Sequence, residues 1–279
     1  MALDYLEAQR AFEEYLEEYD RQDEKIRLKI VHTYGVVACA GEIGKRMGLS
    51  REDGCLGKII ALLHDIGRFE QIRRFDSFLP DTMDHAAYGA ALLFGDMAAV
   101  YGAGEKGMEV LCREPPMIRR FVREREYDRI ICQAIAFHSH LALPPITDPG
   151  ALLHARLIRD ADKLDNCRVK LQERIETMLG MSVQEAGRGK ISPQVWEACQ
   201  RETSVLSAHR RTGVDYWVSY IAQYYDVNFP QTWEIIREED YIRRIAERLQ
   251  YEDPDTREKI ERLIQGVESR MEREIWKNR

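Results

Sequence analysis

Apolar residues recur at steps of three and four along nearly the whole chain, and no long stretch alternates apolar and polar residues with a period of two. The first spacing is typical of amphipathic helices and the second of strands. We therefore predict an all-α fold without β-strands. The expected helices cover residues 3–19, 23–47, 51–64, 84–100, 117–125, 128–139 and 149–179.

Residues with strong preferences for helix ends mark several of these boundaries. Gly48 is expected to end the second helix, and Ser50, with an acidic residue at the capping-box position, to begin the third. Gly67 is expected to break or bend the chain after that helix, and Pro149 is placed to start the last one. Two glycine-rich segments are expected to be loops, residues 101–107 and 180–192.

The residue types with chemical roles are unevenly distributed, and this suggests three segments. Residues 1–22 are expected to form an N-terminal helix, and residues 23–180 contain nearly every candidate site residue. Residues 181–279 stay helical in pattern but are rich in tryptophan and tyrosine, and their last stretch, 255–279, is dense in charges of both signs. We expect this last segment to be a helical cover or a dimerisation element.

Composition excludes several classes of function. With 41 Lys and Arg against 48 Asp and Glu, the 279-residue chain has a formal net charge of -7, which disfavours a partner such as duplex nucleic acid. No apolar run reaches the length of a membrane span, and the first residues are acidic where a signal peptide would be basic and then apolar. A soluble, cytoplasmic protein is therefore expected. The chain lacks the sequence motifs of P-loop, Rossmann, serine-hydrolase and zincin enzymes.

Histidines within apolar helix faces are the most informative feature. His32 lies on the same face as Val36 and Ile43, and His64 ends an apolar helix, with Asp65 directly after it. An imidazole beside a carboxylate is a natural start for a divalent metal site. A single buried histidine is more often a hydrogen-bonded core residue, and a lone His-Asp pair is common by chance, so a further ligand is needed.

A later acidic helix supplies that further ligand. Asp162, in the sequence LIRDADKLDNCR, follows Ile158 and Ala161 on the inward side of its helix. Burial of this carboxylate without a cation or strong donors would be costly. Together with His32 and the His64–Asp65 pair, Asp162 would close around one metal ion from three different helices.

In this order and at these wide separations, His32, the His64–Asp65 pair and Asp162 resemble the H…HD…D signature of the HD-domain metal-dependent phosphohydrolase superfamily. The resemblance spans about residues 23–175 and includes the ADKLDN context of Asp162. It implies a helical bundle with the metal at its centre, and it identifies residues 23–180 as an HD domain.

Three further histidines, His85, His138 and His140, resemble the extra ligands of the dinuclear HD families, which include cyclic-nucleotide phosphodiesterases. This resemblance implies that Asp65 bridges two ions and that His85 and His138 are ligands. Residues two apart on a regular helix point about 200° from each other, so His138 and His140 would share an ion only where the helix ends. His140 is left open between a ligand, a substrate contact and a surface residue. If these histidines have structural roles only, the site holds one ion.

Two cationic residues are candidates for binding phosphate. Arg68 stands three residues after Asp65, where many HD proteins carry lysine, and its planar guanidinium suits phosphate oxygens. Lys163, next to Asp162, would bind substrate or orient a ligand, and the alternative is a surface pairing with Asp165. Other residues have less context: Arg73 and Arg74 extend this basic rim or lie on a solvated helix face, and His154 and His209 are structural or exposed.

The predicted function is hydrolysis of a phosphate ester, as a phosphomonoesterase or a phosphodiesterase acting on a nucleotide or another small phosphorylated molecule. One or two divalent ions (Mn, Fe, Co, Ni or Zn) would lower the pKa of a water that attacks phosphorus. Arg68 and Lys163 would hold phosphate oxygens, Asp65 would bridge the ions, and His140 would protonate the leaving group. Two alternatives stay open: a diiron oxygenase of the HD fold, and a nucleotide-binding regulatory protein with an inactive HD site. We expect no membrane partner, and the C-terminal third is compatible with a homodimer.

Overall fold

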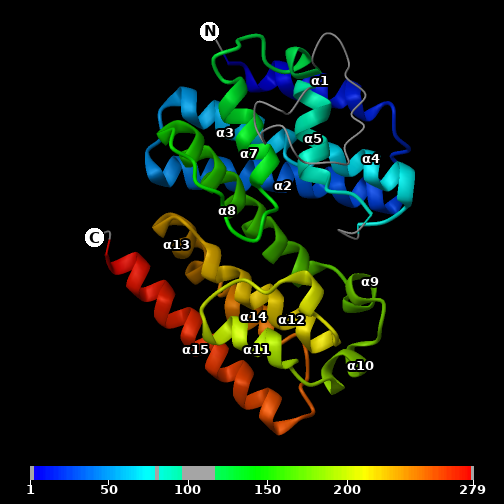
Figure 1. The fold of residues 1–279 in the computed structure, drawn as a ribbon, viewed down its shortest axis with the longest axis vertical. Coiled ribbons are helices and arrows are strands. Elements are labelled where there is room, and N and C mark those ends of the chain that lie inside the picture. The colour runs from blue at the N-terminus through cyan, green and yellow to red at the C-terminus, as the bar shows by residue number, and fades with distance from the viewer. Residues whose placement is uncertain (1–2, 79–81, 96–116, 278–279) are drawn as a thin grey trace. The chain divides into compact units, whose positions relative to one another are not determined.

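The computed structural model describes residues 3–78, 82–95 and 117–277 (Figure 1). Within these residues every regular element is helical, so the prediction of an all-α fold is confirmed. The chain divides into two compact units, residues 1–162 and 163–279, and the division falls inside the long helix α8 (Pro149–Gln172). No helix in the described part of the chain is both long and apolar enough to cross a membrane.

The first unit is a bundle in which α2 packs along α3, and α5 packs against both α4 and α7 (Figure 1). Its elements are α1 (Tyr5–Leu16), α2 (Glu24–Met47), α3 (Arg51–Leu63), α4 (Ile66–Phe75), α5 (His85–Phe94), the 3-10 helix η1 (Met117–Arg120), α7 (Asp128–Phe137) and the first part of α8. Only the first residues of the helix predicted at 117–125 are helical. Residues 96–100 of the helix predicted at 84–100, and the loop predicted at 101–107, lie outside the described residues.

The helix ends of this unit follow the signals in the sequence. Asp23 caps α2 by accepting hydrogen bonds from the backbone of residues 25 and 26, and Gly48 ends it with a left-handed φ of 67°. The Ser50 side chain accepts a hydrogen bond of 3.0 Å from the Asp53 backbone N–H at the start of α3. These caps fix where α3 begins. Its apolar sequence then carries the chain into the core, so that His64 is completely buried at its end.

Gly67 has a different role from the one predicted. The helical path is interrupted at residues 64 and 65, and Gly67 lies inside α4 as its second residue. A methyl group built on Gly67 would overlap the carbonyl oxygen of His85 and stand 2.8 Å from the backbone nitrogen of Gly89. Gly67 is therefore required for the close approach of α4 to α5, which brings His85 toward Asp65.

Substitution of Gly67 by alanine is expected to destabilise the protein although alanine favours helices. The added methyl would meet backbone atoms, which cannot turn aside, so α4 and α5 must separate at a cost of about 1–3 kcal/mol. The matched control is Gly54→Ala within α3, where a methyl would meet no atom within 4 Å. That variant should gain up to about 1 kcal/mol from helix propensity. Urea denaturation measures both changes, and equal stabilities of the two variants would contradict the prediction.

The second unit is also entirely helical in the residues described. It contains the end of α8, then α9 (Ile175–Leu179), α10 (Val183–Arg188), α11 (Pro193–Gln200), η2 (Ser207–His209), α12 (Gly213–Ala222), η3 (Gln223–Asp226), α13 (Pro230–Glu238), α14 (Tyr241–Ala246) and α15 (Pro254–Trp276). The helix predicted at 149–179 is two helices, α8 and α9. Residues 255–276 of the charged segment predicted at 255–279 lie in α15, and residues 278–279 lie outside the described residues.

The loop predicted at 180–192 was wrong in part, because it contains the short helix α10. The side chain of Ser182 accepts from the backbone of Glu185, and the Glu185 side chain accepts from the backbone of Ser182, which forms a complete capping box. Gly187 allows close packing, since a methyl there would overlap the carbonyl oxygen of Gln250. The glycine that suggested a loop is thus explained by tertiary packing.

Candidate metal centre

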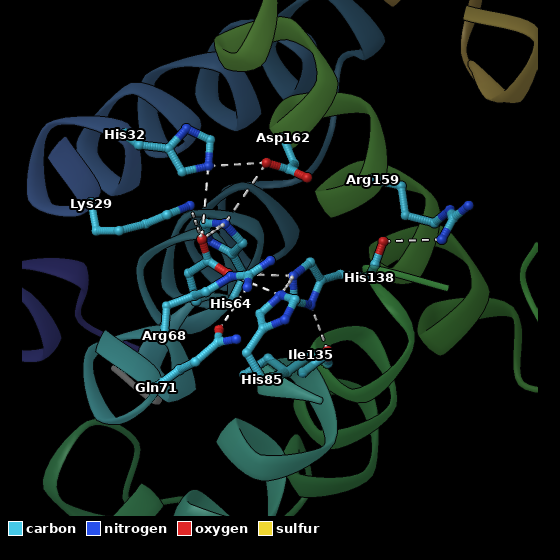
Figure 2. A network of polar contacts seen from close by, with 12 residues as sticks. Lys29, His32, His64, Arg68, Gln71, His85, Ile135, His138, Arg159 and Asp162 are labelled. Atoms are coloured by element: carbon cyan, nitrogen blue, oxygen red, sulfur yellow. Dashed lines mark hydrogen bonds and ion pairs between the residues drawn. The ribbon is translucent and has the colours of Figure 1, made fainter. Parts of the chain in front are cut away.

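Side chains from five helices of the first unit point toward one another in a buried cluster (Figure 2). The cluster contains two sets of three residues, and within each set the ligand atoms lie within 4.8 Å of one another. The two sets share His64. The first set is His32, His64 and Asp162, and the second is His64, Asp65 and His138. His85, from the first turn of α5, lies beside the second set, with its Nε2 atom 3.2 Å from Nε2 of His138.

The two carboxylate oxygens of Asp65 face different histidines. Oδ2 lies 3.5 Å from Nε2 of His64 and 3.9 Å from Nε2 of His32. Oδ1 lies 3.3 Å from Nε2 of His85 and 3.6 Å from Nε2 of His138. One carboxylate therefore connects two pairs of imidazoles, which is the arrangement expected of a group that bridges two ions.

Asp162 completes the side of the cluster formed by His32 and His64. Its Oδ1 atom lies 3.0 Å from Nε2 of His32 and 4.0 Å from Nε2 of His64. Its side chain is 25% exposed, against 4% or less for the side chains of these two histidines. The Asp162 side of the cluster is therefore its more accessible edge.

Backbone carbonyls orient two of the imidazoles. Nδ1 of His64 lies 2.7 Å from the carbonyl oxygen of Ala61, and Nδ1 of His138 lies 2.7 Å from that of Ile135. Because a carbonyl oxygen only accepts, each Nδ1 carries a proton, and in the neutral ring the lone pair is then on Nε2. Both rings thus present a metal-binding nitrogen to the cluster, held by the hydrogen bond that metal-ligating histidines generally make.

These residues fit a divalent transition metal. Nε2 of His64 is buried and has no hydrogen-bond partner among the described residues, although buried polar atoms are normally paired. Imidazole nitrogens with carboxylate oxygens are ligands typical of zinc, iron, nickel, cobalt and manganese. The donor set is suited to bind such an ion, and its identity is not determined by the ligand types.

Burial and neighbouring charges shift the pKa values of four residues of the cluster. Burial lowers the pKa of His64 to about 4 and that of His85 to about 3. Burial alone would raise the pKa of Asp65, but the charge of Lys29 and the contacts with the histidines outweigh it and hold that pKa well below its usual range. Burial also opposes ionisation of Asp162, and the hydrogen bond and charge of His32 lower its pKa despite this. At neutral pH His64 and His85 are neutral and the carboxylates charged.

The metal-free protein is expected to lose stability as the pH falls from about 6.5 toward 4. An unfolded histidine binds a proton near pH 6.5, whereas folded His64 and His85 do so only near pH 4 and pH 3. The unfolded state therefore binds more protons in this window, and each histidine should contribute a loss of about 1 kcal/mol per pH unit. Urea denaturation with a chelator, at several pH values, measures the slope. His85→Gln should flatten it, and stability that is constant between pH 7 and 5 would contradict the expectation.

The buried residue Arg159, in the middle of α8, connects this helix to the C-terminal end of α7, and sequence reasoning did not identify it. Its Nη1 atom donates to the carbonyl oxygens of Phe137, His138 and His140, at 3.1, 3.0 and 2.6 Å. These carbonyls lie at and just after the end of α7, where helix carbonyls have few partners within the helix itself. Arg159 thus holds the backbone that carries His138, as Figure 2 shows, and it lies one helical turn before Asp162.

Two cations face different carboxylate oxygens of Asp65. Nζ of Lys29 lies 2.7 Å from Oδ2, and Nε of Arg68 lies 3.7 Å from Oδ1. Arg68 is held in place because its Nη1 atom donates to Oε1 of Gln71 at 2.6 Å and to the carbonyl oxygen of Phe78 at 3.1 Å. Arg68 was a predicted site residue and Lys29 was not. The sequence offered one signal for Lys29: it lies one turn before His32 on α2, and residues three apart share a helix face.

Other candidate residues have partners elsewhere. Nζ of Lys163 lies 2.7 Å from Asp226, both in the second unit, and Asp165 pairs with Arg168 at 2.7 Å. His140 follows the end of α7, where its ring packs against Phe137 with centroids 5.3 Å apart. The helix therefore ends before His140, with His138 as its C-cap. The roles predicted for Lys163 and His140 stay predictions.

The less certain basic and histidine candidates lie outside the cluster. Arg73 and Arg74 both pair with the buried Glu70 on the same helix, at 2.5 and 3.3 Å. His154 is buried, with Nε2 3.4 Å from Oδ1 of Asp53, and His209 is partly exposed in η2. Their contacts agree with structural or surface roles.

Comparison with known proteins finds one family model that matches part of the chain. The family model of the HD domain matches residues 30–98, which include His32, His64, Asp65 and His85. His138 and Asp162 lie beyond the matched residues, on α7 and α8. No curated protein and no solved structure matches the chain.

Proposed function

Because this chain carries an HD domain of the metal-dependent phosphohydrolase superfamily, we propose that it hydrolyses a phosphate ester of a nucleotide or another small phosphorylated molecule. The observation that carries the proposal is the cluster of histidines around Asp65 and Asp162, bordered by Lys29 and Arg68. The cluster would hold one or two divalent ions, with Asp65 between them.

The charges of the cluster favour an anionic substrate. Asp65 and Asp162 are balanced by Lys29 and Arg68, and His64 and His85 are neutral at pH 7. Any divalent ion bound there makes the local charge positive, in a chain whose net charge is -7. A local positive centre of this kind would attract a phosphate group against the repulsion of the whole protein.

The residues would divide the work of hydrolysis. A divalent ion held by this donor set lowers the pKa of a bound water and offsets charge on phosphoryl oxygens. Arg68, fixed by Gln71 and the Phe78 carbonyl, presents its guanidinium beside Asp65 and would orient a phosphoryl oxygen. His140, just past the end of α7, is a candidate donor of a proton to the leaving group.

A substrate screen with defined metal content tests this proposal. The protein is purified without oxygen, its metals are identified by elemental analysis, and phosphomonoesters, phosphodiesters and nucleotides are assayed with and without a chelator. We expect metal-dependent release of phosphate or of a nucleoside monophosphate. Iron with oxygen consumption but no hydrolysis would favour the oxygenase, and nucleotide binding without turnover would favour the regulatory protein.

A further inference from the structure

Lys29 directs its ammonium group at the same oxygen that faces two of the metal-ligand candidates. Oδ2 of Asp65 lies 2.7 Å from Nζ of Lys29, 3.5 Å from Nε2 of His64 and 3.9 Å from Nε2 of His32. The Lys29 side chain is 16% exposed, so it reaches the cluster from a partly solvated position. The ammonium group of Lys29 therefore occupies a carboxylate oxygen that a bound metal ion would also use.

A lysine in this position opposes the binding of a second cation. A divalent ion held by His32, His64 and Asp162 would share the carboxylate of Asp65 with the ammonium group, and the two positive charges would repel each other. The ammonium is a compact charge on a flexible four-carbon stem, so it can move away from Asp65 without a change in the backbone.

The two cations beside Asp65 differ in their freedom to move. Arg68 is tied by hydrogen bonds to Gln71 and to the backbone of Phe78. Within the described residues, the polar contact found for Lys29 is with Asp65, and its ammonium also lies 5.6 Å from the centre of the Phe78 ring. Lys29 is thus the cation that can exchange its partner.

We propose that Lys29 pairs with Asp65 in the metal-free protein and, once metal binds, transfers its ammonium group to a phosphoryl oxygen of the substrate. The second half rests on the proposed function, and the first half does not. Lys29 would then oppose metal binding and favour phosphate binding, so its removal has effects of opposite sign on the two affinities. A residue that merely supports the fold would change both in the same direction or neither.

Metal titration of the metal-free protein tests the first half. Lys29→Met should bind Mn²⁺ at least about fivefold more tightly than the natural protein, because the competing charge is removed. The matched control is Lys25→Met, which removes a lysine one turn earlier on α2 that pairs with Asp76 and is 39% exposed. Its affinity for Mn²⁺ should not change. Unchanged or weaker binding of Mn²⁺ by Lys29→Met overturns the proposed competition.

Titration of the Mn²⁺-loaded protein with inorganic phosphate tests the second half. Phosphate should bind about tenfold more weakly to Lys29→Met than to the natural protein, and Lys29→Arg should recover most of the affinity because it keeps a charged donor. Equal affinity in the natural protein and Lys29→Met overturns the phosphate contact. If Lys29→Met folds poorly, Lys29→Gln keeps a donor for Asp65 without the charge and serves for both titrations.

The failure of this inference is distinguishable from that of the proposed function. A natural protein that binds Mn²⁺ but neither binds phosphate nor hydrolyses any phosphate ester would refute the function, and with it the phosphate contact of Lys29. The Mn²⁺ titration would still decide whether Lys29 competes with metal. If Lys29→Met hydrolyses phosphate esters as well as the natural protein does, with unchanged KM, only the phosphate contact of Lys29 is refuted.

Discussion

Replacement of Asp65 by alanine is expected to abolish metal binding and turnover together. Its two oxygens face different pairs of histidines, His32 with His64 and His85 with His138, so one substitution removes a ligand from both sides of the cluster. Turnover should fall by more than about 10³-fold, since the charge stabilisation at the reacting group is lost as a whole.

The same substitution should also destabilise the metal-free protein. Lys29 and Arg68 would lose the carboxylate that they share, and their side chains are only 16% and 18% exposed. An unpaired charge of this kind costs about 3–5 kcal/mol when it is fully buried, and less here because both groups reach some solvent.

Elemental analysis, turnover and urea denaturation measure the three effects of Asp65→Ala. Asp65→Asn, which keeps the shape and one oxygen, provides a variant that is more certain to fold. The control is Asp76→Ala, which removes an exposed carboxylate that pairs with Lys25. Metal and turnover retained in Asp65→Ala would refute the assignment of the site.

Loss of either His85 or His138 is expected to reduce the metal content from two ions per chain to one. Nε2 atoms of these residues lie 3.2 Å apart, and both face Oδ1 of Asp65. With one imidazole removed, that side of the cluster retains one histidine of its own and must share His64 and Asp65 with the other ion, which leaves too few ligands for two stable sites. The rate of phosphodiester hydrolysis should then fall by more than the twofold loss of bound metal, because two ions together stabilise the charge on the phosphoryl group.

Metal stoichiometry of anaerobically purified protein measures this change in His85→Ala and His138→Ala. The control is His154→Ala, because His154 is buried, pairs with Asp53 and lies outside the cluster. It should lose stability but keep its metals. One ion in the natural protein, unaffected by either substitution, would confine the site to His32, His64, Asp65 and Asp162. The search for substrates would then move to mononucleotides and phosphomonoesters.

The amino-acid pattern predicted the helical bundle and most of the ligand candidates because both depend on local spacing. A period of three to four apolar residues places His32 on the buried face of α2, and an uninterrupted apolar run carries His64 into the core. The same local rules failed at Gly67 and in residues 180–192. At both places glycine allows two segments to pack closely, and the residues next to it in the sequence do not indicate this contact.

Residues that act through contacts between distant segments required the tertiary structure. Arg159 has the appearance of a surface cation in the sequence, yet it is buried against carbonyls of the α7 terminus about twenty positions earlier. The sequence likewise gives no sign that Lys29 contacts Asp65, because the fold brings the two residues together. Conversely, Lys163 follows a ligand candidate in the sequence but pairs with Asp226.

By itself, the sequence determined that this protein is helical and that His32, His64, Asp65 and Asp162 occur in the order of an HD domain. Only the tertiary structure decided that Asp65 turns one oxygen to each pair of histidines and that Lys29 faces one of these oxygens and Arg68 the other. The reason is physical. Helix periodicity is set by neighbours within one turn, whereas the direction of a carboxylate oxygen depends on how helices far apart in the chain pack together.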